Sequence, residues 1–312
     1  MGKIPVGRTI GQTYEFVFQK YGSLLGVVWL PMVALAALGY FLFLPALMQI
    51  FDQLPWTFQH PGEPDFTWMI SGAFLWLRLF QVLVLLLFVV IRVGITKEAL
   101  GIRKGPKFFY VPADSSELLV VVCYIILYVA MIAVIIAAVI AGAFIALLAG
   151  SVAAAAGHFD LHAPGQQLWG ILGLVLLVAV LGCAAFYILV RLTFLMIPAT
   201  VAERRIGIGR SWSLTRGNFW RIVVVVIAAW LPLIVLEGIV FSIVGLPFML
   251  QVAAAAHGNH ADVHALFQSL AKNMIYYIPW FWGVGLLFAP IFFGLTTAPS
   301  AFAYRALVPP PA

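Results

Sequence analysis

The sequence predicts an all-α fold, a polytopic membrane protein with six transmembrane helices, and two observations lead to that prediction. Of the 312 residues, 64% are hydrophobic and 9% are charged, whereas a soluble globular chain averages about 45–50% apolar and about 25% charged residues. The apolar residues also gather into long runs, and a helix needs roughly 20 such residues to cross about 30 Å of hydrocarbon. Residues 1–312 are therefore expected to form a single integral membrane domain.

The elements are expected in a regular order along the chain. A basic, amphipathic helix at 8–21 precedes the first span, and a second at 207–219 precedes the fifth span. In the second helix Ile208, Trp212 and Phe219 fall at spacings that place them on one face. Such helices lie in the membrane interface, with basic side chains near lipid phosphates. The predicted spans cover approximately residues 22–50, 68–95, 118–150, 168–198, 220–250 and 276–306.

Positive charge predicts the orientation of these spans. Lys and Arg concentrate on the set of connecting segments that includes both termini. The opposite set, near 51–67, 151–167 and 251–275, contains one lysine, Lys272, together with several acids. Because Lys and Arg in short flanking loops resist translocation, both termini are expected in the cytoplasm. The interfacial helices would lie on that side of a bacterial-type inner membrane.

The two interfacial helices and the spans that follow them are similar, which predicts an internal repeat of helical hairpins. Ile10 aligns with Ile208 and Lys20 with Asn218, and both spans then contain the tripeptide Trp-Leu-Pro. Convergent membrane-interface chemistry would explain the basic and aromatic residues, but it does not readily explain the shared tripeptide. Span starts near 22, 118 and 220 leave a threefold repeat open.

The segment VRLTFLMIPATVAERRIGIGRSWSLTRGNFWRIVVVV, from Val190 to Val226, resembles the membrane domain of some bacterial glycerophosphoryl diester phosphodiesterases and of related multi-span membrane proteins. The family pattern is present as Arg191 and Phe194 at a span end, a Pro-Ala-Thr-x-x-Glu step at 198–203, and a Ser-Trp-x-Leu-Thr-Arg-Gly-Asn-Phe-Trp-Arg run at 211–221. In that family the phosphodiesterase chemistry belongs to a separate soluble barrel, and no segment here corresponds to one. The resemblance therefore implies a membrane module rather than the activity in the family's name.

Arg78 and Glu237 are the only charges well inside the predicted spans. An isolated charge at the membrane centre costs at least about 2.5–3.5 kcal/mol, so such residues usually face the bundle interior and pair. The two are expected to form an intramembrane charge pair. The pair would either lock spans two and five together or handle a proton or substrate at the midplane.

Two further groups are candidates for binding. Arginines near the second interfacial helix could contact anionic lipid or phosphate, although membrane topology and general attraction to lipid, worth about 1 kcal/mol per residue, also explain them. These arginines are Arg204, Arg205, Arg210, Arg216 and Arg221. Histidines of the outer loops could bind zinc, nickel or copper, although a loop that excludes Lys and Arg also tolerates solvated histidines. The metal candidates are His158, His162, His257, His260 and His264.

These observations favour a non-catalytic membrane module or scaffold. The sequence contains no serine elbow, His-Glu-x-x-His motif, P-loop or pair of intramembrane aspartates, so neither an enzyme nor a cofactor is expected. Its expected partners are membrane lipids with anionic headgroups on the cytoplasmic face and other membrane proteins or further copies of the chain, but not nucleic acid. The alternatives are a small transporter or lipid-handling protein that uses Arg78 and Glu237, and an outer-face metal-binding protein.

Overall fold

A computed structural model describes residues 2–49, 72–103, 108, 110, 114–155, 164–246, 250 and 263–308. Within these ranges the chain forms helices and turns, with no strand, so the all-α prediction is confirmed. The elements are α1 (Val6–Gln19), α2 (Tyr21–Leu38), the π-helical turn η1 (Gly39–Phe43), α4 (Gly72–Leu100), α5 (Ser116–Ala155), α6 (Pro164–Thr193), α7 (Met196–Glu203), α8 (Ile208–Leu214), α9 (Phe219–Val240), the π-helical turn η3 (Phe241–Gly245) and α11 (Val263–Leu307).

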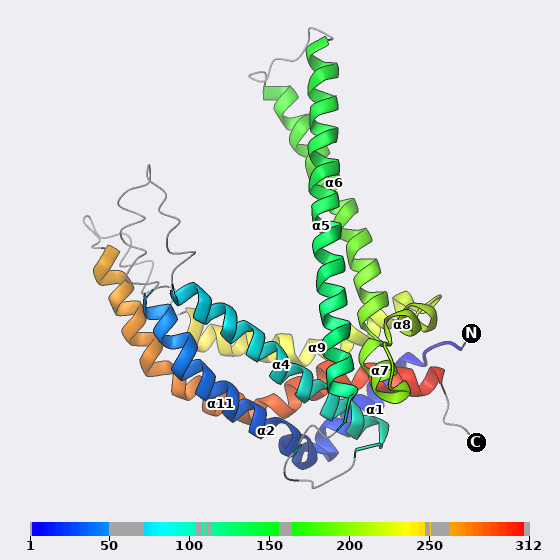
Figure 1. Cartoon of the computed structure of the whole chain (residues 1–312), viewed down its shortest axis with the longest axis vertical. Helices are drawn as coiled ribbons and strands as arrows, with labels where there is room; N and C mark the ends of the chain where they lie inside the picture. The colour runs from blue at the N-terminus through cyan, green and yellow to red at the C-terminus, as the bar shows by residue number, and fades with distance from the viewer. Residues whose placement is uncertain are drawn as a thin grey trace.

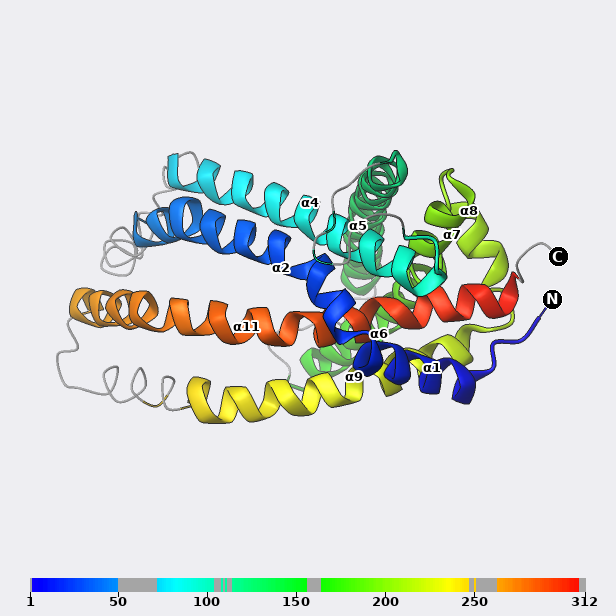
Figure 2. The ribbon, with the colours of Figure 1, turned by 90° about the horizontal axis from the view of Figure 1, so that it is seen from below.

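The helices form two arms that meet at a common base (Figures 1 and 2). The first arm contains α2, α4, α9 and α11, and the second is the α5–α6 hairpin. α1, α7, α8 and both chain ends lie at the base. In the first arm α11 packs against α2, α4 and α9, and its apolar stretch is 61% buried, against 11–28% for the other spans. α11 is therefore the central helix of that arm.

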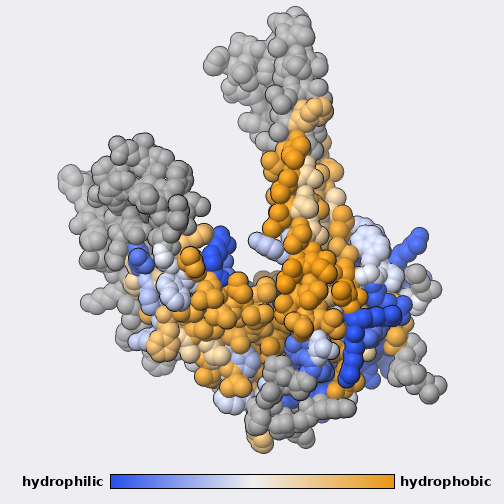
Figure 3. Space-filling view, viewed as in Figure 1, coloured by the Kyte–Doolittle hydropathy of each residue, from blue (hydrophilic) through white to orange (hydrophobic). Residues whose placement is uncertain are grey.

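Within the described ranges, six helices are long and apolar enough to cross a membrane, which agrees with the predicted multi-pass architecture. Their ranges are Tyr21–Gln49, Phe74–Leu100, Ser116–Ala137, Ala179–Glu203, Phe219–Ile243 and Trp282–Leu307, of which Ala179–Glu203 includes the end of α6 and all of α7. Large apolar side chains are exposed on the described parts of both arms, and many hydrophilic residues lie at the base (Figure 3). Such a surface suits lipid, because acyl chains are as apolar as a leucine side chain.

The predicted span 168–198 is not one continuous helix, and the prediction is corrected in this respect. α6 ends at Thr193 and a separate helix, α7, begins at Met196. Pro198 lies in the first turn of α7, where its missing N–H removes no helical hydrogen bond. In the interior of an uninterrupted helix, the ring of Pro198 would clash with the carbonyl of Phe194. Pro198 therefore suits the start of a new helix, whereas Pro31 and Pro232 lie inside α2 and α9.

The predicted interfacial helix 207–219 is too long at its C-terminal end. α8 ends at Leu214, and Gly217 adopts a φ of 76°. That left-handed conformation suits glycine because it has no Cβ. Phe219 then begins α9, so it does not continue the face of α8 that contains Ile208.

Asn218 attaches the N-terminal residues to the corner between α8 and α9. Its buried side chain accepts a hydrogen bond from the Ile4 N–H at 3.1 Å and donates one to the Gly2 carbonyl at 3.1 Å. The Arg221 guanidinium also donates to the Ile4 carbonyl, at 2.9 Å. Although Asn218 occupies the N-cap position of α9, its side chain makes no capping bond there. The Asn218 side chain therefore holds the N-terminal residues rather than capping α9.

Replacing Asn218 with alanine is expected to lower the free energy of unfolding by about 1–3 kcal/mol, because the buried Ile4 N–H loses its partner. The measurement is thermal unfolding in detergent, followed by tryptophan fluorescence. Ser213→Ala, which removes an exposed hydroxyl from the same corner, is the control and should unfold like the wild type. An unchanged Asn218→Ala variant would mean that this contact does not stabilise the fold.

Candidate functional site

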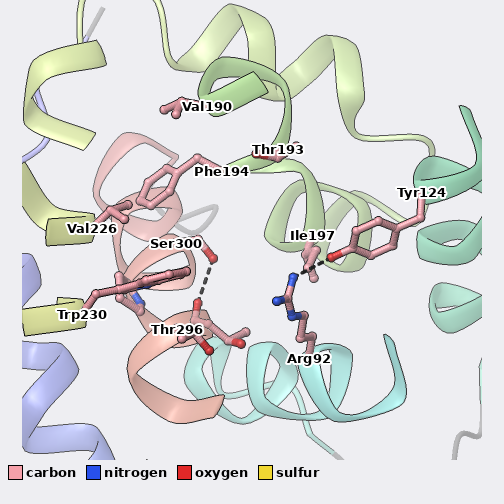
Figure 4. A pocket seen from close by; sticks show the side chains of 12 residues that line it. Arg92, Tyr124, Val190, Thr193, Phe194, Ile197, Val226, Trp230, Thr296 and Ser300 are labelled. Carbon is pink, nitrogen blue, oxygen red and sulfur yellow. Dashed lines mark hydrogen bonds between the residues drawn. The ribbon is translucent and has the colours of Figure 1, made fainter. Parts of the chain in front are cut away.

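A cavity of about 350 Å³ lies where the two arms meet (Figure 4). α4, α9 and α11 line it from the first arm, α5 and α6 line it from the second, and α7 completes it. The apolar lining consists of Val190, Phe194, Ile197, Val226, Trp230 and Pro299. The polar lining consists of Arg92, Tyr124, Thr193, Thr296, Thr297 and Ser300.

Arg92 extends from α4 towards Tyr124 of α5 (Figure 4). Its Nη1 donates to the Tyr124 hydroxyl at 2.8 Å, whereas its Nε is buried and has no partner among the described residues. The rotation of α4 is set on two sides of the helix. Ile91 and Ile95 belong to one apolar cluster and Val89 and Val93 to another. Packing of both faces therefore holds Arg92 at the cavity.

The charge of Arg92 has little compensation from the residues around it. Arg92 lies eight residues before the end of α4 at Leu100, which is about 12 Å along the helix at about 1.5 Å per residue. In the described part of the chain no carboxylate lies within ion-pair distance of its guanidinium. A charge among apolar helices is stabilised by an opposite charge or by hydrogen bonds, and among the described residues the Arg92 guanidinium has one side-chain partner, the Tyr124 hydroxyl.

The hydroxyl groups of the cavity differ in their hydrogen bonding. Three of them donate to backbone carbonyls of their own helices: Thr193 to Leu189 at 2.8 Å, Thr296 to Phe292 at 2.9 Å and Ser300 to Thr297 at 2.8 Å. Thr297 is 3% exposed, and its hydroxyl has no partner among the described residues. The cavity thus contains two unsatisfied polar atoms, and buried polar groups are rarely left without a partner.

This composition suits the binding of an anion. The lining contains one cation, several hydroxyls and no carboxylate. Guanidinium groups bind phosphate and carboxylate oxygens through parallel, charge-assisted hydrogen bonds. A bound anion would neutralise Arg92 and could satisfy both its Nε and the Thr297 hydroxyl.

A second polar cluster joins the end of α4 to the start of α5. The Lys97 ammonium donates to a Glu117 carboxylate oxygen at 2.9 Å and to the Tyr110 hydroxyl at 3.0 Å. The Tyr110 hydroxyl donates to the same carboxylate oxygen. Burial, together with that hydrogen bond and the Glu117 charge, raises the pKa of Tyr110 above its usual range. The cluster therefore keeps the tyrosine protonated.

Asp114 lies at the edge of this cluster, 3.2 Å from the Lys97 ammonium. Burial acts to raise the pKa of Asp114. Hydrogen bonds from Ser116, together with the hydrogen bond and charge of Lys97, outweigh that effect and lower it to about 2. Asp114 therefore remains ionised at neutral pH and stabilises the charge of Lys97.

The predicted pair of Arg78 and Glu237 is not formed, which corrects that prediction. Arg78 donates to Gln81 at 3.2 Å, and its guanidinium lies 4.7 Å from the centre of the Phe74 ring. Glu237 is exposed, and in the described ranges no ion pair joins it to Arg78. The reason is the packing of the first arm: α2 and α11 lie between α4 and α9 when the molecule is seen from below (Figure 2).

The five predicted lipid-contacting arginines have different surroundings. Arg205 and Arg210 both pair with Glu203, at 2.7 Å and 2.9 Å, and Arg221 bonds to the Ile4 carbonyl. Arg204 and Arg216 are exposed. Of the five arginines, Arg204 and Arg216 are therefore the two whose side chains have no partner among the described residues.

Arg191, which belongs to the segment that carries the family resemblance, connects α6 to α8. Its buried guanidinium donates to the Trp212 carbonyl at 2.8 Å and to the Tyr187 hydroxyl at 3.0 Å. It also lies 3.8 Å from the centre of the Trp212 ring. These contacts hold α8 against the end of α6.

The metal candidates cannot be compared with the structure. His158, His162, His257 and His260 lie outside the described residues, and only the backbone of His264 is described, in the first turn of α11.

The sequence does not single out Arg92, which lies near the end of the predicted span 68–95 among the positive charges that predict the orientation of the chain. The available signals were the position of Arg92 inside the predicted span 68–95 and the hydroxyl-rich run Thr296–Ser300 inside the last span. Neither signal shows that the two segments meet.

No family model, curated protein or solved structure matches the chain.

Proposed function

We propose that this protein is a non-catalytic integral membrane module that binds a phosphate-bearing lipid in the cavity at Arg92. The observation that carries the proposal is the Arg92 guanidinium, which has no carboxylate partner among the described residues and a buried Nε without a hydrogen-bond acceptor. In a medium of low polarity the attraction between such a cation and an anion is much stronger than in water.

A lipid fits the surroundings of this cation better than a soluble solute does. The cavity lies between arms whose large apolar side chains are exposed, and Phe194, Val226 and Trp230 line it beside the polar groups. A phospholipid combines an anionic phosphate with apolar chains, so one molecule satisfies both kinds of lining. A free phosphate ion would satisfy only the polar part.

The expected result is that Arg92→Gln weakens retention of phospholipid by about 10- to 100-fold, since a hydrogen bond to a charged group contributes about 1.5–3 kcal/mol. Native mass spectrometry of the full chain, released from detergent, would score the bound masses. Arg92→Lys keeps the charge and should retain part of the binding. Arg78→Gln, on the same helix but outside the cavity, is the matched control and should bind lipid like the wild type.

Two further measurements identify the source of the phosphate and exclude unfolding. Circular dichroism and thermal unfolding of each variant would confirm that the fold is intact. Millimolar inorganic phosphate, added before release, should not displace the lipid if the apolar chains contribute to binding. Equal lipid retention by wild type and Arg92→Gln would refute the proposal, and retention of inorganic phosphate without lipid would replace it with a solute site.

The proposed location is a bacterial-type inner membrane, with both termini in the cytoplasm. Its support is the distribution of Lys and Arg and the position of α7 and α8 at the base beside both termini (Figure 1), because Arg204, Arg205, Arg210 and Arg216 lie in or next to these two helices. With this orientation, Arg204 and Arg216 would contact anionic headgroups, and α1 and α8 would lie near the cytoplasmic interface. The family resemblance of Val190 to Val226, and binding to other membrane proteins or to further copies of the chain, stay predictions.

The internal repeat is part of the proposal as well. Its support is that Lys20 separates α1 from α2, and that Asn218 is the last of the four residues between α8 and α9; the alignment pairs Lys20 with Asn218. Their backbone angles are similar, with φ −101° and ψ 16° at Lys20 and φ −115° and ψ 7° at Asn218. α2 and α9 each contain one proline, Pro31 and Pro232, and each continues into a π-helical turn.

A further inference from the structure

The polar side chains of the cavity fall into two groups, those with a free hydrogen-bond acceptor and those with a free hydrogen-bond donor. Because Thr193, Thr296 and Ser300 donate their protons to backbone carbonyls, their hydroxyl oxygens remain available as acceptors. Arg92, Thr297 and the Tyr124 hydroxyl, which accepts from Arg92, remain available as donors. A ligand that matches this pattern needs an anionic acceptor group for the donors and separate hydrogen-bond donors for the hydroxyl oxygens.

The positive charge of Arg92 limits which hydrogen-bond donors the ligand can carry. An ammonium group would supply them, but it would add a second positive charge near Arg92 without a carboxylate among the lining residues. Like charges in a site of low polarity repel strongly. Neutral hydroxyl groups supply the same donors without this repulsion.

We infer that the lipid bound at Arg92 is a glycerol phosphodiester lipid of the phosphatidylglycerol class, selected against lipids whose headgroup carries an ammonium. This inference rests on the proposed function, because it names the lipid for the same cavity. The phosphodiester accepts from Arg92 and Thr297. The headgroup hydroxyls donate to the hydroxyl oxygens of α11, where Thr296 and Ser300 lie close together on one side of the cavity (Figure 4).

The test is a competition between lipids with identical dioleoyl chains. Purified full-length protein is incubated with equal amounts of phosphatidylglycerol, phosphatidylethanolamine and phosphatidic acid, and retained lipid is scored by native mass spectrometry. We expect phosphatidylglycerol to be retained about tenfold more than phosphatidylethanolamine, because the ammonium of phosphatidylethanolamine places a second positive charge near Arg92. Phosphatidic acid, which lacks the glycerol hydroxyls, should fall between them.

The double variant Thr296→Val/Ser300→Ala tests the role of the hydroxyl oxygens. It should lower phosphatidylglycerol retention towards that of phosphatidic acid and leave phosphatidic acid itself unchanged. Ser242→Ala removes an exposed hydroxyl that bonds to a carbonyl of its own helix outside the cavity. It is the matched control and should keep the preference of the wild type.

The outcomes separate this inference from the proposed function. If phosphatidylglycerol and phosphatidylethanolamine are retained equally, and both are lost in Arg92→Gln, the headgroup inference is wrong and the lipid site stands. If no lipid depends on Arg92, both fail. If the double variant keeps the full preference for phosphatidylglycerol over phosphatidic acid, the assignment of the headgroup hydroxyls to α11 is wrong.

Discussion

Replacing Glu117 with leucine is expected to lower the free energy of unfolding by about 3–5 kcal/mol, the usual cost of removing one partner of a buried ion pair. Lys97 and Glu117 are each 7% exposed. The carboxylate also accepts from Tyr110, so leucine would leave a buried ammonium and a buried hydroxyl with less compensation. Asp114, 3.2 Å from Lys97, would compensate the ammonium only in part. Chemical unfolding in detergent, followed by circular dichroism, measures the effect.

Two controls distinguish the ion pair from a general effect of leucine. Glu15→Leu replaces an exposed glutamate on α1 and is expected to change stability by no more than about 0.5 kcal/mol. The double variant Lys97→Met/Glu117→Leu removes both buried charges, and it should recover much of the loss because the charge that remains, Asp114, has a side chain 36% exposed and keeps its hydrogen bonds from Ser116. Equal stability of Glu117→Leu and Glu15→Leu would show that the pair does not stabilise the junction of α4 and α5.

Replacing Gly207 with alanine is expected to destabilise the corner between α7 and α8 by about 1–3 kcal/mol or more, the cost of overpacking a tight contact. A Cβ at this position would lie 2.6 Å from the Thr200 hydroxyl oxygen and 2.7 Å from both the Met196 carbonyl and the Thr200 backbone nitrogen. The last two atoms belong to the backbone of α7 and cannot move independently. The backbone angles of Gly207, φ −89° and ψ 0°, are accessible to alanine, so the effect is steric.

Gly209→Ala provides a matched control two residues along the chain. No atom lies within 4 Å of a Cβ built at Gly209, which is inside α8. Alanine there should therefore stabilise the protein by up to about 1 kcal/mol through its higher helix propensity. Thermal unfolding of the two variants should shift in opposite directions. A Gly207→Ala protein as stable as the wild type would mean that α7 and α8 separate easily at this corner.

Local properties of the chain explain why the spans could be predicted. Whether a segment can cross a membrane depends on its own length and apolarity, so the predicted starts at 22 and 220 fall within one residue of the observed starts at Tyr21 and Phe219. The ends of helices were less predictable. α7 begins two residues before Pro198, and α8 ends three residues before Gly217, which has a positive φ. Single residues of this kind are hidden by a long apolar or amphipathic pattern.

The sequence by itself therefore determined the helical class, the six segments that are long and apolar enough to cross a membrane, and the connecting segments that carry positive charge. Each of these follows from neighbouring residues. Only the tertiary structure decided which polar residues meet. α4 is apolar around most of its circumference, so hydropathy does not set its rotation. Its packing between two apolar clusters directs Arg92 to the cavity and leaves Arg78 apart from Glu237. The contacts of Arg92 with distant α5, and its place beside α11, arise from helix packing rather than from any local pattern.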